Sequence, residues 1–164
     1  MGTALRVLVA DDHAMNRLLL KTIFECFGCS VTAVENGAEA LAAEGGFDLV
    51  FLDRHMPVMG GPAAAAMRGR AYMVACTSDP GGDLSDFHMV LPKPISCEDV
   101  ARAIGAARLW QVCCAAEGWG RADAMRAGRR LADLLRRDAD QAREVRRVLA
   151  AAHLPGARPV RLVA

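Results

Sequence analysis

The sequence predicts an α/β fold, in which a doubly wound, five-stranded parallel sheet is followed by an arginine-rich helical extension. The first hundred residues alternate short apolar runs with segments whose apolar residues recur at helical spacing. The apolar runs are continuous, as in parallel strands that helices cover on both faces. Arginine, by contrast, is concentrated after residue 120. We therefore divide the chain into a domain over residues 1–109 and an extension over residues 110–164.

Each strand and helix of the domain follows from a local pattern. The strands correspond to short apolar runs at residues 5–10, 30–34, 47–52, 72–76 and 88–91. The helices correspond to segments of helical spacing at residues 14–27, 37–44, 62–69 and 96–107. Gly28 is a suitable C-cap for the first helix, and Ser96, with Asp99 three residues later, is a suitable N-cap for the last.

The composition, 53% hydrophobic and 24% charged, suits a packed core and argues against broad disorder. Uninterrupted apolar runs reach only about five residues, well short of the roughly 18–20 that span a bilayer. The N-terminus lacks the pattern of a secretory signal. We therefore expect a cytoplasmic protein without membrane association. Cys26 and Cys29 have CxxC spacing but no second pair, so we expect buried thiols rather than a zinc site.

The net charge of +1 conceals two oppositely charged parts. Residues 1–120 hold nine Lys or Arg against fourteen Asp or Glu, a net charge of −5. Residues 121–164 hold eleven Arg and no Lys against five acids, a net charge of +6. This asymmetry indicates an anionic partner for the basic extension. Arginine also favours bidentate recognition of anions, although genomic base composition is an equally open explanation for its excess over lysine.

Charged and hydroxyl side chains stand at the ends of four predicted strands. Asp11 and Asp12 follow the first strand, Asp53 the third, Thr77 the fourth and Lys93 the last. Because the carboxyl ends of parallel strands share one edge of a sheet, these five side chains should converge there. Clustered carboxylates favour a hard divalent ion such as Mg²⁺, and a lysine beside a hydroxyl complements a phosphoryl group. The pattern predicts transfer of phosphate to an aspartate.

The same motifs resemble a family. VLVADD, LVFLDRHMPVMGG, VACTS and LPKPI, in this order, are similar to those of bacterial response-regulator receiver domains of the CheY-like type over about residues 4–109. The resemblance implies a flavodoxin-like receiver fold, with Asp53 as the phosphoacceptor and a histidine kinase or phosphotransfer protein as partner. It also implies that Thr77 and Lys93 contact the phosphoryl oxygens and that Lys93–Pro94 is cis.

The resemblance further implies a Mg²⁺ site. Asp12 and Asp53 would bind the ion directly, Asp11 through water, and His55 through its main-chain carbonyl. No other nucleophile and base pair occurs in the chain, so we expect no enzymatic activity beyond accepting and losing a phosphate.

The chain departs from the family pattern between Thr77 and Lys93. Only fifteen residues separate them, too few for a loop, a full helix and a strand. We therefore predict that the fourth helix is shortened or lost. Val90 stands where the family has its switch aromatic, so we expect the usual coupling of hydroxyl and aromatic, and the usual output face, to be altered.

The extension predicts an amphipathic helix. Leu131, Leu134, Leu135, Ala142, Val145 and Leu149 fall on one side at 100° per residue, and arginines on the other. One reading is a helix that packs its leucines on the domain or on a second copy, giving a homodimer.

A second reading makes the extension a nucleotide site. Trp119, Arg121 and Asp123 offer the stacking face, fork and acceptor that a guanine requires. Arg126, Arg129 and Arg130 follow, where phosphates would be held. The extension resembles the arginine-rich tails of CheY-like effectors that bind cyclic di-GMP and act at the flagellar motor. On this reading the tail is mobile when free and ordered when bound.

Three functions remain open from the sequence. The first is an adaptor whose tail binds cyclic di-GMP and thereby controls docking to a protein such as the flagellar motor switch. The second is a conventional receiver that relays phosphate through Asp53, with the tail as a dimerisation or docking helix. The third, nucleic-acid binding by the tail, is disfavoured by the acidic body.

Overall fold

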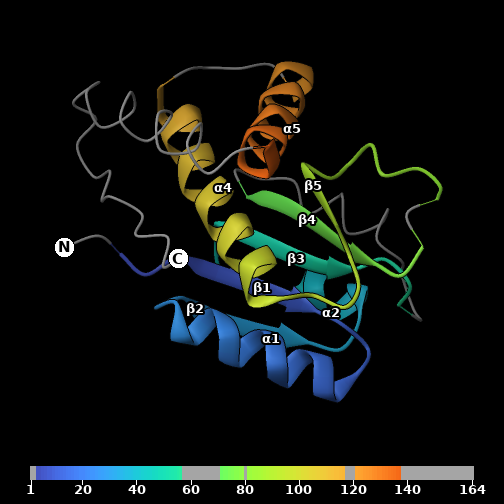
Figure 1. Cartoon of the computed structure of the whole chain (residues 1–164). Helices are drawn as coiled ribbons and strands as arrows, with labels where there is room; N and C mark the ends of the chain where they lie inside the picture. Colours follow the sequence, from blue (N-terminus) through green and yellow to red (C-terminus); the bar gives the residue numbers. More distant parts are fainter. Residues whose placement is uncertain (1–2, 57–70, 80, 117–120, 138–164) are drawn as a thin grey trace.

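A computed structural model of the chain describes residues 3–56, 71–79, 81–116 and 121–137, and it contains the predicted sheet (Figure 1). The strands are β1 (Arg6–Ala10), β2 (Ser30–Val34), β3 (Leu49–Asp53), β4 (Tyr72–Thr77) and β5 (Met89–Pro92). They pair in the order β2-β1-β3-β4-β5, and every pair is parallel. The prediction of a five-stranded parallel sheet is confirmed.

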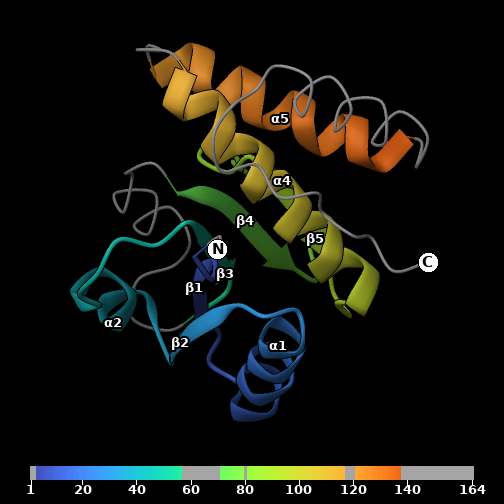
Figure 2. The same cartoon turned by 90° about the vertical axis from the view of Figure 1, so that its left-hand side faces the viewer.

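Helices cover both faces of the sheet, as a doubly wound fold requires (Figure 2). Helices α1 (Ala14–Cys26) and α4 (Cys97–Ala116) lie on one face, and α2 (Gly37–Ala42) lies on the other. Each face has its own buried cluster, the first built around Phe24, Phe51 and Trp110, the second around Leu8, Leu52 and Met73. The helix predicted at 62–69 lies outside the described residues.

Helix α4 begins as predicted but ends later. The Asp99 N–H donates to Ser96 Oγ at 3.1 Å and the Ser96 N–H to Asp99 Oδ2 at 2.9 Å, so the two residues form a reciprocal cap. The helix then runs to Ala116, past the predicted end at 107, because Leu109 and Trp110 continue its buried face. The predicted boundary between residues 109 and 110 therefore falls within a continuous helix.

The segment between β4 and β5, residues 78–88, is called the β4–β5 connection below. Its described residues, 78–79 and 81–88, form turns and bends, and none of them is helical. The predicted loss of the fourth helix is thus confirmed. Phe87 is buried and Leu84 partly buried against the second cluster, so the connection itself covers this part of the sheet.

Helix α5 (Arg121–Arg137) packs against α4 and β5. Leu131 and Ala132 are buried in the first cluster, and the Tyr72 hydroxyl donates to the Gly128 carbonyl at 2.8 Å. Residues 121–137 thus form a packed helix in this structure, and the expected mobility of the tail without ligand stays a prediction. The described apolar residues of α5 pack within the same chain, because Leu135 also lies partly buried against the first cluster. Leu134 is not described at side-chain level, and Ala142, Val145 and Leu149 lie outside the described residues.

The contact between α5 and the sheet centres on His88. Its ring stacks on Tyr72 with centroids 4.8 Å apart and lies 4.5 Å from the ring of Trp110. The Met73 N–H donates to His88 Nδ1 at 2.8 Å. A Cβ at Gly128 would lie 2.4 Å from His88 Cδ2, so α5 approaches this ring as closely as only glycine allows. Burial, with a contribution from Arg129, lowers the pKa of His88 to about 4.

Within the described parts of the chain, no helix is both long enough and apolar enough to cross a membrane.

Candidate functional site

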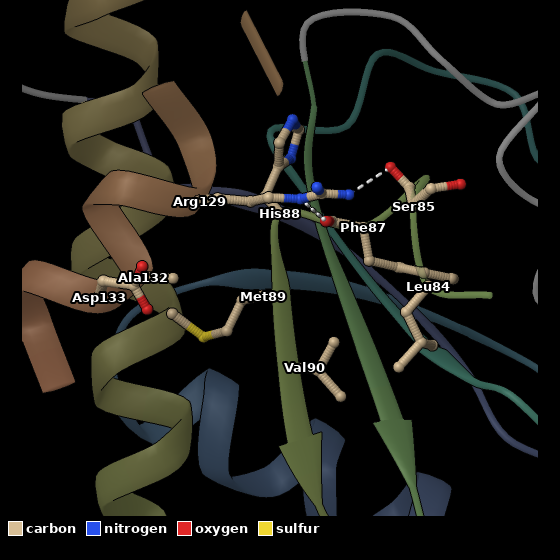
Figure 3. A pocket seen from close by; sticks show the side chains of 9 residues that line it. All are labelled: Leu84, Ser85, Phe87, His88, Met89, Val90, Arg129, Ala132 and Asp133. Carbon is tan, nitrogen blue, oxygen red and sulfur yellow. Dashed lines mark hydrogen bonds between the residues drawn. The ribbon is translucent and has the colours of Figure 1, made fainter. Parts of the chain in front are cut away.

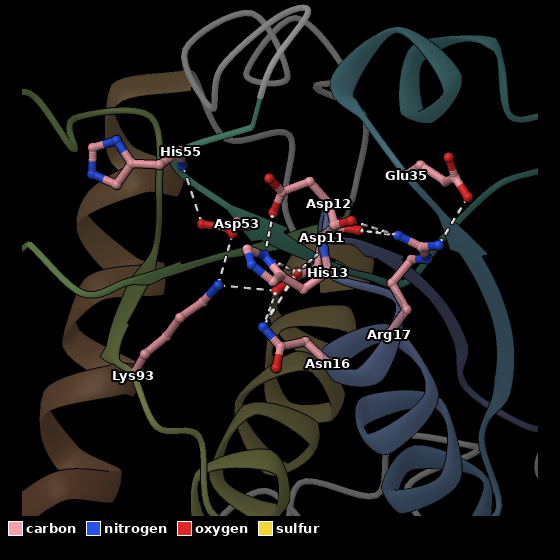
Figure 4. A network of polar contacts seen from close by, with 9 residues as sticks. All are labelled: Asp11, Asp12, His13, Asn16, Arg17, Glu35, Asp53, His55 and Lys93. Atoms are coloured by element: carbon pink, nitrogen blue, oxygen red, sulfur yellow. Dashed lines mark hydrogen bonds and ion pairs between the residues drawn. The ribbon is translucent and has the colours of Figure 1, made fainter.

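The carboxyl edge of the sheet gathers the predicted acids and the lysine (Figure 4). Asp53 ends β3 beside Cys76 of β4, and Asp11 directly follows β1 in the neighbouring position. Asp11 and Asp53 are buried and fully hydrogen-bonded. Parallel register places successive strand ends on one rim, which is why residues 42 positions apart in the chain meet here.

Lys93 holds two carboxylates together. Its Nζ lies 3.0 Å from Asp11 Oδ2 and 2.7 Å from Asp53 Oδ2. Burial alone would lower the pKa of Lys93, but the hydrogen bonds and charges of Asp53 and Asp11 outweigh it and the pKa is raised. The ammonium therefore compensates the two buried carboxylates. The peptide bond between Lys93 and Pro94 is cis, as the resemblance implied.

Asp12 and a residue that the sequence reading missed form the outer part of the site. One donor atom each from Asp11, Asp12 and His13 lie within 4.8 Å of one another. His13 Nδ1 is 2.9 Å from Asp12 Oδ1 and 3.9 Å from Asp11 Oδ1. The partly exposed carboxylate of Asp12 and the buried carboxylate of Asp11 beside it offer the oxygen donors that Mg²⁺ prefers, so the residues present fit the ion. His13 directly follows the acidic pair, and this adjacency was the available signal.

The predicted direct ligand Asp53 is not a member of that group. Its Oδ2 faces Lys93, and its Oδ1 accepts the His55 N–H at 3.1 Å. His55 therefore contributes a main-chain N–H that donates to Asp53. Its predicted carbonyl contact to the ion, like the ligand roles of Asp11, Asp12 and Asp53, stays a prediction.

Two more side chains that the sequence reading missed fix the acidic turn. Arg17 Nη1 donates to the carbonyls of Asp11 and Asp12 at 2.9 and 3.1 Å, and its Nη2 donates to Glu35 at 2.8 Å. Asn16 Nδ2 donates to both oxygens of Asp11 at 3.3 Å. Both residues belong to the first turns of α1, so the start of this helix orients the acidic pair.

Thr77 is buried at the end of β4, but its hydroxyl is engaged with the β4–β5 connection. Thr77 Oγ1 donates to the Asp79 carbonyl at 2.7 Å and accepts the Asp79 N–H at 3.1 Å. Arg54, which follows the predicted phosphoacceptor, donates through Nη1 to the Asp79 carbonyl at 3.1 Å and to the Gly81 carbonyl. Arg54 was also missed, because nothing local in the sequence pairs it with a segment 25 residues away.

The predicted nucleotide-binding residues are only partly described. Arg126, Arg129 and Arg130 lie on α5, and all three are exposed. Arg129 donates from Nε to the Phe87 carbonyl at 3.3 Å and from Nη2 to the Ser85 carbonyl at 2.6 Å (Figure 3). Trp119 lies outside the described residues, and the side chains of Arg121 and Asp123 are not described. The guanine site stays a prediction, with Arg129 already bound to main-chain carbonyls.

Two pockets flank these groups. A pocket of about 390 Å³ adjoins the carboxylates, and it is lined by Asp11, Asn16, Leu19, Leu20, Lys93, Pro94 and Ile95. A second pocket, of about 370 Å³, lies between β5 and α5, and Figure 3 shows the residues that line it, among them Leu84, Phe87, Arg129 and Ala132. The first is lined by Asp11 and Lys93 of the carboxyl-edge site, and the second by Arg129 of the predicted nucleotide-binding residues.

Comparison with known proteins agrees with this geometry. The Response regulator receiver domain model matches residues 7–75. The two-component response regulator ORR42 of Oryza sativa subsp. japonica is 33% identical over 93 residues, which cover 52% of this chain and 70% of that protein. The sensory/regulatory protein RpfC of Xanthomonas campestris pv. campestris is 46% identical over 61 residues, which cover 35% of this chain but only 8% of that protein.

Solved structures show the same fold. The response regulator TrrA of Thermotoga maritima, solved in complex with Mg²⁺ and BeF, is 28% identical with a TM-score of 0.58, covering 63% of this chain and 98% of that one. The receiver domain of Ssk1, in its co-crystal structure with the Saccharomyces cerevisiae histidine phosphotransfer protein Ypd1, is 23% identical with a TM-score of 0.59, covering 68% and 93%. From the sheet, the carboxyl-edge site and these relatives together, the chain belongs to the response regulator receiver family of two-component systems.

Proposed function

We propose that this receiver domain accepts a phosphoryl group on Asp53 from a phosphohistidine of a partner protein. The observation that carries the proposal is Lys93, whose Nζ contacts both Asp53 and Asp11. In the step, an Asp53 carboxylate oxygen attacks phosphorus, the P–N bond breaks, and the histidine nitrogen keeps the electron pair. Lys93 is positioned to move from the free carboxylate to a phosphoryl oxygen, which keeps the added negative charge compensated.

Mg²⁺ completes the charge balance in this proposal. Asp11 and Asp12 would hold it at the rim, beside the predicted carbonyl ligand of His55, and the ion would neutralise phosphoryl oxygens that Lys93 does not reach. Asn16 donates to the Asp11 carboxylate, and Arg17 donates to the main-chain carbonyls of Asp11 and Asp12, so both residues orient the acidic pair. The structure of TrrA was solved in complex with Mg²⁺ and BeF, and this supports the same use of the site here.

The apolar surface of α1 supports a protein as the phosphoryl donor. Met15, Leu18 and Leu19 are 75%, 58% and 54% exposed, and Leu19 also lines the pocket beside Lys93. Exposed large apolar side chains that gather beside a reactive site are typical of an interaction surface. Since the Ssk1 receiver binds the phosphotransfer protein Ypd1, we infer a histidine kinase or phosphotransfer domain as partner here.

The test is phosphotransfer itself. The wild type should take up ³²P from a phosphorylated histidine phosphotransfer protein in the presence of Mg²⁺, and Asp53→Asn should take up none. Asp48→Asn is the matched control, because Asp48 pairs with Arg6 near the amino end of the sheet. Labelling of Asp53→Asn to the wild-type level would refute the assignment.

A specific feature of α5 supports a second activity, binding of cyclic di-GMP as a signal that controls docking to a protein such as the flagellar motor switch. Arg126 and Arg130 are exposed one turn apart on α5, and Arg129 lies between them. The guanidinium groups of Arg126 and Arg130 are of the kind that complements phosphates, whereas Arg129 is bound to main-chain carbonyls. In calorimetric titration with cyclic di-GMP, Arg126→Ala combined with Arg130→Ala should abolish binding, whereas Arg6→Ala should not. Absence of binding to the wild type would remove this activity and leave the phosphoryl site untouched.

A further inference from the structure

Two arginines from outside the β4–β5 connection donate hydrogen bonds to its main chain, one toward each end. At the end near Asp53, Arg54 donates to the carbonyls of Asp79 and Gly81. Gly82 has a φ of +96°, and a Cβ there would lie 1.9 Å from Arg54 Nη2. A side chain at this position would therefore displace the guanidinium, and the glycine leaves the space that Arg54 fills.

The hydrogen bonds of Arg54 involve the same carbonyl that the Thr77 hydroxyl contacts. Thr77 Oγ1 and Arg54 Nη1 donate to the same acceptor, the Asp79 carbonyl, at 2.7 and 3.1 Å. A hydroxyl has one proton to donate, so Thr77 must give up its bond to the Asp79 carbonyl before it can donate to a phosphoryl oxygen. Every contact that holds Asp79 in its present place thus stabilises the form of the site without phosphate.

At the other end, the connection is tied to helix α5. Arg129 donates to the carbonyls of Ser85 and Phe87 at 2.6 and 3.3 Å, as Figure 3 shows. The helix is itself fixed to the domain, because Leu131 and Ala132 are buried in its core. Movement of the connection away from Thr77 must therefore either break the Arg129 contacts or move α5.

We propose that Arg54 and Arg129 are paired positioning residues that hold the β4–β5 connection, and with it Thr77, in the unphosphorylated arrangement. This rests on the proposed phosphoryl site and adds its regulation. Removal of either arginine's hydrogen bonds lowers the free energy needed to break the Thr77–Asp79 bond. A phosphoryl group should therefore bind more tightly. By thermodynamic reciprocity, a phosphoryl group at Asp53 should loosen α5.

The probe for this coupling is beryllofluoride with Mg²⁺, titrated against the full chain and followed by tryptophan fluorescence and by calorimetry. Arg129→Ala should bind it about fivefold more tightly than the wild type. Arg54→Lys should do the same, because it keeps the positive charge beside Asp53 but its shorter side chain loses the Nη1 bonds to the Asp79 and Gly81 carbonyls. The double variant should tighten binding by less than the product of the two single effects, since both act on one segment.

The control is Arg6→Ala, which removes an exposed arginine and its Asp48 contact far from the connection and should leave the affinity unchanged. A merely structural Arg129 would lower the stability without tightening beryllofluoride binding. Amide exchange in residues 121–137 should also accelerate when beryllofluoride binds.

Unchanged or weaker binding by Arg129→Ala, or unchanged exchange in α5, overturns the coupling while wild-type binding upholds the phosphoryl site. No binding to the wild type overturns both.

Discussion

Replacement of two helical glycines by alanine gives a sharp test of how α5 packs on the domain. Gly105 lies in α4 and Gly128 in α5, and both are buried. Alanine in a helix interior is favoured over glycine by about 1 kcal/mol, so both variants share the same gain in helix propensity. What differs is the space that the added methyl group meets.

At Gly105 the new Cβ would lie 4.0 Å from Leu135 Cδ1, an ordinary van der Waals contact. Gly105→Ala should therefore stabilise the protein by about 1 kcal/mol. At Gly128 the new Cβ would lie 2.4 and 2.8 Å from Cδ2 and Cγ of His88. The ring cannot easily yield, because Met73 N–H donates to it and Tyr72 and Trp110 lie against it.

Overpacking of this kind costs about 1–3 kcal/mol, and a shift of α5 would also strain the bond from the Tyr72 hydroxyl to the Gly128 carbonyl, worth about 1 kcal/mol. Net of the propensity gain, Gly128→Ala should be destabilised by about 1–3 kcal/mol. The two variants differ by about 2–4 kcal/mol, so their Tm values should differ by about 4–16 °C, given about 2–4 °C per kcal/mol for a chain of this size. The assay is urea and thermal unfolding of the full chain, read by circular dichroism and tryptophan fluorescence. If Gly128→Ala stabilises as much as Gly105→Ala, α5 does not pack on His88 as described.

Three further outcomes follow from the same structure. Burial lowers the pKa of His88 to about 4, below its ordinary 6.5, so the unfolded chain takes up the His88 proton at a higher pH than the folded chain does. The free energy of unfolding should therefore drop by roughly 2–3 kcal/mol from pH 6.5 to pH 4. In denaturant titrations, His88→Gln should show a smaller drop over the same pH range. Lys93→Met leaves two carboxylates without their ammonium, so Mg²⁺ should raise the Tm of this variant more than that of the wild type in thermal scans, and an equal rise would contradict the charge balance. Cys29 is buried as expected but Cys26 is exposed, so the expectation of two buried thiols is wrong for Cys26. Burial raises the pKa of the Cys76 and Cys29 thiols, so iodoacetamide should label Cys26 and Cys97 first, as measured by mass spectrometry.

The carboxyl-edge site was predictable because it depends only on periodicity and order. Once Asp11, Asp53 and Lys93 are known to follow parallel strands, their meeting at one rim follows from the geometry of the sheet. The short spacing between Thr77 and Lys93 likewise sufficed to predict the missing helix. The roles of His13, Asn16 and Arg17 were within reach, since they adjoin the acidic pair in the chain.

The packing of α5 could not be predicted in the same way. An amphipathic pattern shows that a helix has an apolar side, but not which surface will cover that side. The covering surface depends on His88, Tyr72 and Trp110, which come from three different elements and meet only after the sheet has formed. Arg129 shows the same limit, because its charge indicated an anion whereas its partners here are the neutral carbonyls of Ser85 and Phe87.

The two parts of the molecule are therefore constrained by different physics. Strand register fixes where Asp11 and Asp53 stand relative to each other, and connection lengths have little influence on that placement. The response to phosphorylation depends on the connections, because Thr77 can move only as far as Asp79 and the segment behind it allow. In this chain that segment has lost its helix and gained Arg54 and Arg129 as anchors. The surface that changes on phosphorylation should then be the β4–β5 connection with α5, and a partner that distinguishes the two states should contact residues of that surface.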